Sequence, residues 1–215
     1  MPRQNRVNPF GEFVATPARG TFMGNRGGCL HDDNGEMTQR RWTSSAWISC
    51  VLEWKDYRQK INAPGHYTQL FFHDEAVAIA AGHRPCAQCR REAFNRFKVA
   101  WAGAFPEEAQ EPKAPEMDKV LQPERVDRNT RGQIRYQEGW QSLPDFAFFT
   151  DGAAQIAFMK LGDGARQWSF EGYGDIVRPP AQEVTVLTPE PMIAILRAGY
   201  TPQIAVGQKS GLELR

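Results

Sequence analysis

The stretch AAGHRPCAQCRREAF, residues 80–94, places Cys86 and Cys89 behind a proline and ahead of a pair of arginines. The sequence predicts that a helix begins near Cys86, because the apolar residues that follow recur at helical spacing: Ala93, Phe94, Phe97 and Trp101. The cysteine pair would then lie at a helix N-terminus, where backbone N–H groups favour the thiolate form.

The segments before this pair predict a strand, a hairpin and a short helix. WISCVLEWK (47–55) alternates with period two and places Cys50 on the more apolar face of a strand. A turn near residues 63–65 would return the chain so that residues 67–72 pair beside this strand, antiparallel. The run of helix formers that ends at Gly82 predicts a short helix with a glycine cap.

The remaining segments indicate an α+β protein that ends in a β-rich domain with one terminal helix. Residues 1–40 are rich in glycine and predict loops, with at most a short strand over 20–23. Proline and acidic residues in 104–118 predict a linker between a first domain, 1–103, and a second domain, 119–215.

The second domain has the pattern of short strands and one terminal helix. Asp-Gly turns divide the stretch 146–174, EVTVLT (183–188) predicts another strand, and residues 189–200 predict a helix that stops at Gly199. No motif in this domain identifies its role.

Composition bounds the class of protein. The chain has 215 residues, 41% of them hydrophobic, with 26 Lys and Arg against 25 Asp and Glu. Since no run approaches the ~20 apolar residues that span a bilayer, we expect no membrane insertion. The N-terminus lacks the apolar segment of a secretory signal, so we expect a cytoplasmic protein. In a reducing compartment the four cysteines are more typical of metal binding or redox chemistry than of disulfides.

The C-x-x-C spacing of Cys86 and Cys89 predicts half of a tetrahedral zinc site. Three residues are the leading candidates for the other two ligands: Cys29, His31 and Cys50. The ligands of a zinc site commonly come from separate elements, so spacing alone leaves the choice among them open.

Three other interpretations of the pair remain. A thioredoxin-like redox site would have a strand before the C-x-x-C, whereas a helix and a glycine are predicted here. Zinc nucleobase deaminases carry H-x-E followed by P-C-x-x-C, and residues 73–75 and 85–89 match both halves, with Glu75 as the proton carrier. The short predicted helix between them leaves no room for the helix and strand of that layout. Alternatively, the two cysteines are ordinary small residues that pack at the start of a helix and bind nothing.

The segment FFHDEAVAIAAGHRPCAQCRRE, residues 71–92, resembles the second half of the zinc module of the Ada DNA methyl-phosphotriester repair family. The resemblance implies a small α/β fold in which four cysteines bind one zinc, one of the first two accepts a methyl group from DNA, and the module binds DNA. Cys86 and Cys89 match the two later ligands. The chain lacks the closely spaced earlier pair of that family, so the resemblance identifies no methyl acceptor.

Basic residues beside the cysteine pair predict contacts to nucleic-acid phosphates, through Arg84, Arg90, Arg91 and Arg96. The sequence therefore predicts a zinc protein that binds nucleic acid, such as DNA, in repair or regulation. The alternatives are a zinc-dependent hydrolase or nucleobase deaminase that uses Glu75, and a structural zinc protein that binds other proteins.

Overall fold

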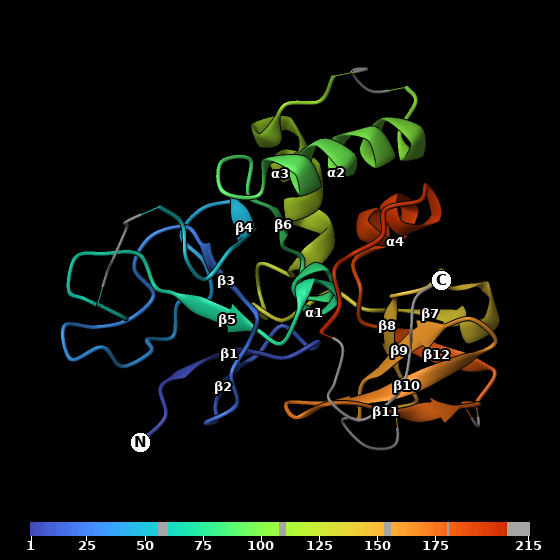
Figure 1. The fold of residues 1–215 in the computed structure, drawn as a ribbon, viewed down its shortest axis with the longest axis horizontal. Helices are drawn as coiled ribbons and strands as arrows, with labels where there is room; N and C mark the ends of the chain where they lie inside the picture. Colours follow the sequence, from blue (N-terminus) through green and yellow to red (C-terminus); the bar gives the residue numbers. More distant parts are fainter. Residues whose placement is uncertain (56–59, 108–110, 153–155, 180, 206–215) are drawn as a thin grey trace.

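The computed structural model describes residues 1–55, 60–107, 111–152, 156–179 and 181–205. Within these ranges the chain forms two six-stranded sheets and four α-helices, which confirms the predicted α+β class. The two sheets lie side by side, with helix α1 between them and helices α2 and α4 along one side (Figure 1).

The first sheet has the strand order β2-β1-β5-β3-β4-β6. Its strands are β1 (Gln4–Val7), β2 (Phe13–Ala15), β3 (Phe22–Arg26), β4 (Trp47–Cys50), β5 (Leu70–Phe72) and β6 (Arg84–Pro85). Three of them fall in the first 40 residues, where loops and at most one short strand were expected. β1 and β3 alternate buried and more exposed side chains, but the buried positions include Asn5, Gly24 and Arg26, so the period is not one of hydrophobic residues.

The predicted hairpin between β4 and β5 is wrong. β3 lies between them and pairs antiparallel with both, so the first sheet is assembled from strands distant in sequence. β4 instead has β6 as its other neighbour, in parallel.

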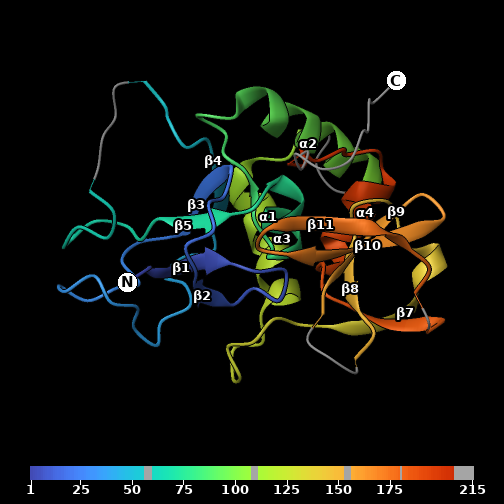
Figure 2. The ribbon, with the colours of Figure 1, turned by 60° about the horizontal axis from the view of Figure 1, so that its bottom comes forward.

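The second sheet is antiparallel at every pair, in the order β11-β10-β9-β8-β12-β7. Its strands are β7 (Tyr136–Gly139), β8 (Phe148–Thr150), β9 (Phe158–Leu161), β10 (Gly164–Ser169), β11 (Gly172–Val177) and β12 (Glu183–Val186), with a 3-10 turn at Trp140–Ser142. The turned view in Figure 2 shows this sheet beside the first.

The helices are α1 (Glu75–Ala80), α2 (Arg91–Ala104), α3 (Ala114–Arg125) and α4 (Glu190–Arg197). Asp74 caps α1 by accepting a hydrogen bond from the Val77 N–H at 3.0 Å. Gly82 ends α1 with φ +79°, as predicted. α2 begins at Arg91 rather than near Cys86, because the cysteine pair occupies a separate turn before the helix.

Helix α3 is a helix that the sequence did not predict. It begins inside the expected linker 104–118, with Pro115 in its first turn, a position that tolerates proline because it needs no N–H donor. Pro123 lies in its last turn. The proline and acidic content that indicated a linker is therefore partly the start of a helix.

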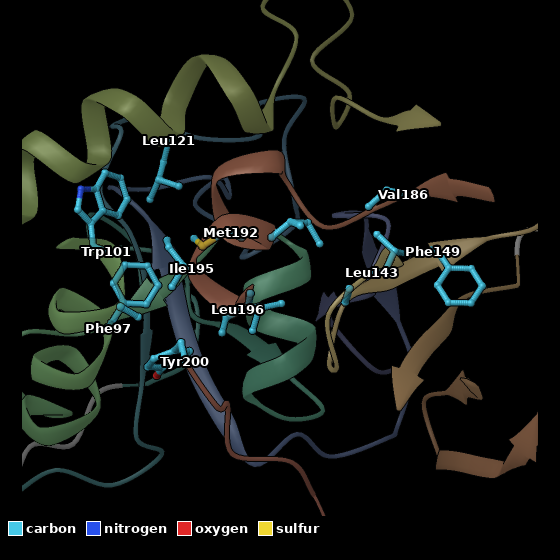
Figure 3. Close-up of a cluster of buried hydrophobic side chains, with 14 of the residues drawn as sticks. Phe97, Trp101, Leu121, Leu143, Phe149, Val186, Met192, Ile195, Leu196 and Tyr200 are labelled. Carbon is cyan, nitrogen blue, oxygen red and sulfur yellow. The ribbon is translucent and has the colours of Figure 1, made fainter. Parts of the chain in front are cut away.

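Two clusters of buried apolar side chains form the core, and each contains residues from before and after 104–118. Figure 3 shows the first, in which Met192 and Ile195 of α4 lie between Trp101 of α2 and the second sheet's Phe149. The other packs α1 and the first sheet against Phe148, Met159 and Leu187. The division into domains at residues 104–118 stays a prediction.

Candidate metal centre

Three cysteines from three parts of the sequence meet at one edge of the first sheet. Cys50 ends β4, Cys86 follows β6, and Cys89 lies in the turn before α2. Their sulfur atoms all lie within 4.8 Å of one another. Three sulfurs bound to one zinc at ~2.3 Å would be ~3.8 Å apart, so this group needs only a small contraction to hold the ion.

The parallel pairing of β4 and β6 brings the first two cysteines together. Ser49 lies opposite Pro85 in the register, and the Cys86 N–H donates to the Ser49 carbonyl oxygen at 2.9 Å. Because the strands run in the same direction, the residues that follow this matched pair, Cys50 and Cys86, leave the sheet side by side. The interpretation of Cys50 as a strand residue is confirmed.

The turn after Cys86 places the third sulfur and supplies hydrogen bonds. The Arg90 N–H donates to the Cys86 carbonyl oxygen at 3.1 Å, which closes the turn that carries Cys89. The Gln88 N–H donates to the Cys86 sulfur at 3.4 Å. Backbone donors of this kind stabilise a thiolate whether or not it is bound to a metal.

The three thiols interact strongly with one another. Hydrogen bonds from the thiols of Cys50 and Cys89, together with backbone N–H groups, lower the pKa of Cys86 to about 2. The pKa of Cys50 is raised, first by its hydrogen bond to Cys86 and then by those to Cys89 and by burial. One thiolate is thus held by two thiols, and a cation that replaces their protons would satisfy all three sulfurs.

Two cysteines of the group are buried and the third is partly exposed. Cys50 and Cys86 are 8% and 9% exposed, and Cys89 is more accessible. The described residues supply three thiolate ligands, a soft donor set that suits zinc and other thiophilic metals. A tetrahedral ion held here would keep a fourth position for water or another ligand.

The structure does not bring Cys29 or His31 into this group. The Cys29 thiol donates to the His31 carbonyl oxygen at 3.1 Å. Both ring nitrogens of His31 are occupied, Nδ1 with the Thr68 hydroxyl at 2.6 Å and Nε2 with the Ala63 carbonyl oxygen at 3.2 Å. These two candidates belong to a separate loop region.

Glu75 is the centre of a buried polar network rather than a member of the cysteine group. It is fully buried, accepts from Arg90 Nη2 and the Gln203 N–H through Oε2 at 2.7 and 2.8 Å, and from the Tyr200 hydroxyl through Oε1 at 2.6 Å. Arg90 also donates to Ser49 Oγ at 2.8 Å. Both carboxylate oxygens are therefore engaged, which leaves the deaminase interpretation without a free base.

The four arginines expected to contact nucleic acid fall into two classes. Arg84 and Arg90 are buried, and Arg84 forms a two-pronged pair with Asp118 of α3 at 2.9 and 2.7 Å. Arg91 and Arg96 are exposed on α2. Only the second class can reach an external phosphate without rearrangement.

Sequence reasoning missed Ser49 and Tyr200, which connect the cysteine-bearing strands to Glu75 and the C-terminal segment. The one feature of the sequence that could have pointed to Ser49 was its position next to Cys50. Their partners are 41 and 125 residues away in the chain, beyond the reach of local patterns.

Comparisons with protein-family models, with curated proteins and with solved structures find no match to this chain. None of the helices in the described part of the chain has the length and apolar character needed to cross a membrane.

Proposed function

We propose that this protein binds one zinc ion through Cys50, Cys86 and Cys89 and contacts nucleic acid with the surface beside that ion. The observation that carries the proposal is the convergence of three cysteine sulfurs within 4.8 Å at the ends of β4 and β6. Free cysteines pack like other small apolar residues, and such packing does not by itself require three sulfurs at one point.

A zinc site with three thiolates carries less negative charge than one with four. Three thiolates and Zn²⁺ carry a net charge of about −1, less than the −2 of a four-thiolate site. A zinc-bound thiolate remains a nucleophile, and an open fourth position admits water or a substrate atom.

Nucleic-acid contact is supported by the helix that follows the cysteines. Arg91 and Arg96 are exposed on α2, and Glu92 is the one acidic residue of that helix. Guanidinium groups on a helix surface bind phosphates in a salt-sensitive manner that carries no sequence preference. The similarity of residues 71–92 to the Ada module favours DNA as the nucleic acid and repair or regulation as the setting.

Two measurements test the two parts separately. Elemental analysis of the purified chain should give one zinc per chain, reduced strongly in Cys86→Ser and unchanged in Cys29→Ser. Absence of zinc in the unaltered chain, or equal loss in Cys29→Ser, would contradict the metal part.

Binding to a short DNA duplex should be measured at several salt concentrations. The double change Arg91→Gln with Arg96→Gln should flatten the dependence of log affinity on log salt by a slope of ~2, since each lost phosphate contact removes ~0.9. The matched control, Arg19→Gln with Arg178→Gln, removes two exposed arginines elsewhere and should leave the slope unchanged. Equal slopes in both variants would contradict the proposed surface.

A further inference from the structure

We propose that a second site, an arginine-lined pocket at the opposite end of β4 from the cysteines, binds a phosphate-bearing anion. The pocket has a volume of about 700 Å³. Trp47 at the start of β4 lines it, whereas Cys50 at the end of that strand belongs to the metal group, ~10 Å away along a strand that rises ~3.3 Å per residue. The site is independent of the proposed zinc and nucleic-acid function.

Positive charge dominates the pocket lining. Five arginines line it: Arg26, Arg41, Arg125, Arg131 and Arg135. The lining contains one acidic side chain, Glu12, which is exposed and accepts a hydrogen bond from Asn8 at 3.0 Å. The lining therefore carries four more positive than negative charges, in a chain whose overall net charge is +1.

The two deepest arginines are buried without a carboxylate partner. Arg26 and Arg125 are 3% and 1% exposed. Neither forms an ion pair with any residue whose position the structure gives. Asp118 is close enough to Arg125 to influence it, but its two oxygens are occupied by Arg84.

Weak or neutral acceptors take the place of that missing carboxylate. Arg26 donates to His83 Nε2 at 3.3 Å and to the carbonyl oxygens of Gly11 and Ala81 at 3.2 and 3.4 Å. Arg125 donates to carbonyl oxygens and to the side-chain oxygen of Gln122. Buried cations that lack a counter-charge are costly, so a bound anion would stabilise this arrangement.

Aromatic side chains hold the buried guanidinium groups in position. The Arg26 and Arg125 guanidinium carbons lie 3.9 and 4.3 Å from the ring centroid of Trp47, and Arg26 also lies 5.0 Å from that of Phe13. The aromatic surfaces of the pocket are thus already used by arginine. A ligand would be recognised through its charge and not through stacking of a flat ring.

A turn at residues 127–132 positions the rim of the pocket. The Asp127 carboxylate accepts from the N–H groups of Asn129 and Thr130 at 2.7 and 2.8 Å, and the Arg131 N–H donates to the Asp127 carbonyl oxygen at 2.8 Å. Arg131 adopts φ +58°, a conformation uncommon for a residue with a side chain. Such local strain is typical of functional positions, and here it belongs to an exposed arginine that lines the pocket.

A donor and an unsatisfied acceptor meet beside Gly11. A side-chain carbon at this glycine would lie 3.6 Å from both Arg26 Nη2 and Gln133 Oε1. Gln133 donates through Nε2 to the carbonyl oxygens of Ala80 and Leu187 at 2.6 Å each, but its Oε1 is buried without a partner. A hydroxyl group of a ligand could donate to Gln133 Oε1, whereas Arg26 Nη2 already donates to the carbonyl oxygens of Gly11 and Ala81.

These features favour phosphate oxygens as the chemistry that is recognised. Planar guanidinium groups bind phosphate with paired hydrogen bonds, and five of them suit a ligand with at least two negative charges. Such phosphates have two sources, a free phosphorylated small molecule and the backbone of a nucleic acid.

The test is isothermal titration calorimetry of the full chain, with pyrophosphate in one arm and a short single-stranded DNA in the other. The pocket variant is Arg131→Gln with Arg135→Gln, which alters two exposed rim residues and leaves the buried pair in place. Arg128→Gln with Arg178→Gln is the matched control, because Arg128 is exposed on the same turn but does not line the pocket. Both variants keep the cysteines, so binding of pyrophosphate to a metal ion there would affect both equally and could not explain a difference between them.

We expect pyrophosphate to bind the unaltered chain and the control equally, with affinity lowered about tenfold or more in the pocket variant, since hydrogen bonds to charged groups are strong. If DNA alone binds, with the same loss in the pocket variant but not in the Arg91 and Arg96 variant, the phosphate comes from a nucleic acid. The proposal is overturned if neither probe binds, or if the pocket variant and the control bind equally. Failure here leaves the zinc proposal standing, because the latter depends on metal content.

Discussion

At the scale of single residues, the burial of Glu75 makes it a structural carboxylate. Its partners come from the turn before α2 and from the C-terminal segment, so one side chain joins parts of the chain that are more than 100 residues apart. The H-x-E pattern suggested a proton carrier from residue types alone. Burial and partners, which the sequence does not display, indicate a different role.

Removing the charge of Glu75 should therefore destabilise the fold. Glu75→Gln leaves Arg90 buried without its counter-charge, and we expect the free energy of unfolding in urea to fall by ~3–5 kcal/mol. Glu92→Gln, an exposed position on α2, should change it by less than ~0.5 kcal/mol. Equal effects in the two variants would show that the buried pair contributes nothing.

His83 should make stability depend on pH. Burial, followed by the nearby charges of Arg26 and Arg125, lowers the pKa of His83 well below 6.5 in the folded state. Below pH ~6.5 the unfolded chain then binds a proton that the folded chain does not, so stability falls with falling pH by at most ~1.4 kcal/mol per unit.

Urea unfolding measured at several pH values between neutral and moderately acidic checks this prediction. His83→Gln should be less stable at neutral pH but should lose less stability on acidification, and the exposed control His66→Gln should keep the full dependence. If the stability of His83→Gln depends on pH as strongly as that of the unaltered chain, His83 does not contribute to the pH dependence.

The three clustered cysteines show how much can be predicted from single residues. Cys86 and Cys89 follow from their spacing, and Cys50 was among the candidates because a strand carries it. The choice of Cys50 over Cys29 and His31 depends on the register of β4 with β6. That register joins residues 36 apart, so no local pattern contains it.

At the scale of elements, a helix or strand was predictable where its own residues carry a pattern typical of that element. β4 and most of α2 are present where apolar spacing indicated them, and α1 and α4 where helix-forming runs that end at a glycine did. Strand partners were not predictable, because β3 enters between β4 and β5 from an earlier part of the chain. α3 was hidden by its prolines, which suit a linker and a helix start equally.

The close approach of β3 and β4 gives a prediction about Gly24. An added Cβ there would lie 2.2 Å from the Ile48 carbonyl oxygen and 2.9 Å from the Phe72 ring. Gly24→Ala should lower the free energy of unfolding by ~1–3 kcal/mol through overpacking. It should also lower the zinc content, because it displaces the strand that ends at Cys50.

The matched control is Gly174→Ala in β11, where the nearest atom to the new carbon is 3.7 Å away, an ordinary contact. Chemical denaturation and elemental analysis of both variants provide the comparison. A Gly24→Ala protein as stable and as rich in zinc as Gly174→Ala would contradict the tight packing of β3 on β4.

At the scale of the whole molecule, the two core clusters join both halves of the chain. Helix α4, near the C-terminus, packs on α2 and α3, and α1 packs against residues of the second sheet. Composition correctly indicated a core of this size. The sequence could not show that the core is shared, because it does not state which apolar faces meet.

A shared core predicts cooperative unfolding. Tryptophan fluorescence and far-ultraviolet circular dichroism should give one coincident urea transition for the full chain. A fragment of residues 1–103 should fail to fold, since Phe97 and Trp101 would lose the side chains of α3 and α4 that cover them. Two separate transitions, or a folded fragment, would support independent domains on either side of 104–118.

We propose that Cys50, Cys86 and Cys89 hold one zinc ion and leave one coordination position for a non-protein ligand. X-ray absorption at the zinc edge of the purified full chain tests it most directly, with Cys50→Ser and Cys29→Ser as the matched pair. We predict three sulfurs at ~2.3 Å and one lighter atom, with one sulfur lost in Cys50→Ser and none in Cys29→Ser. Four sulfurs, or a shell that changes in Cys29→Ser and not in Cys50→Ser, would contradict the account.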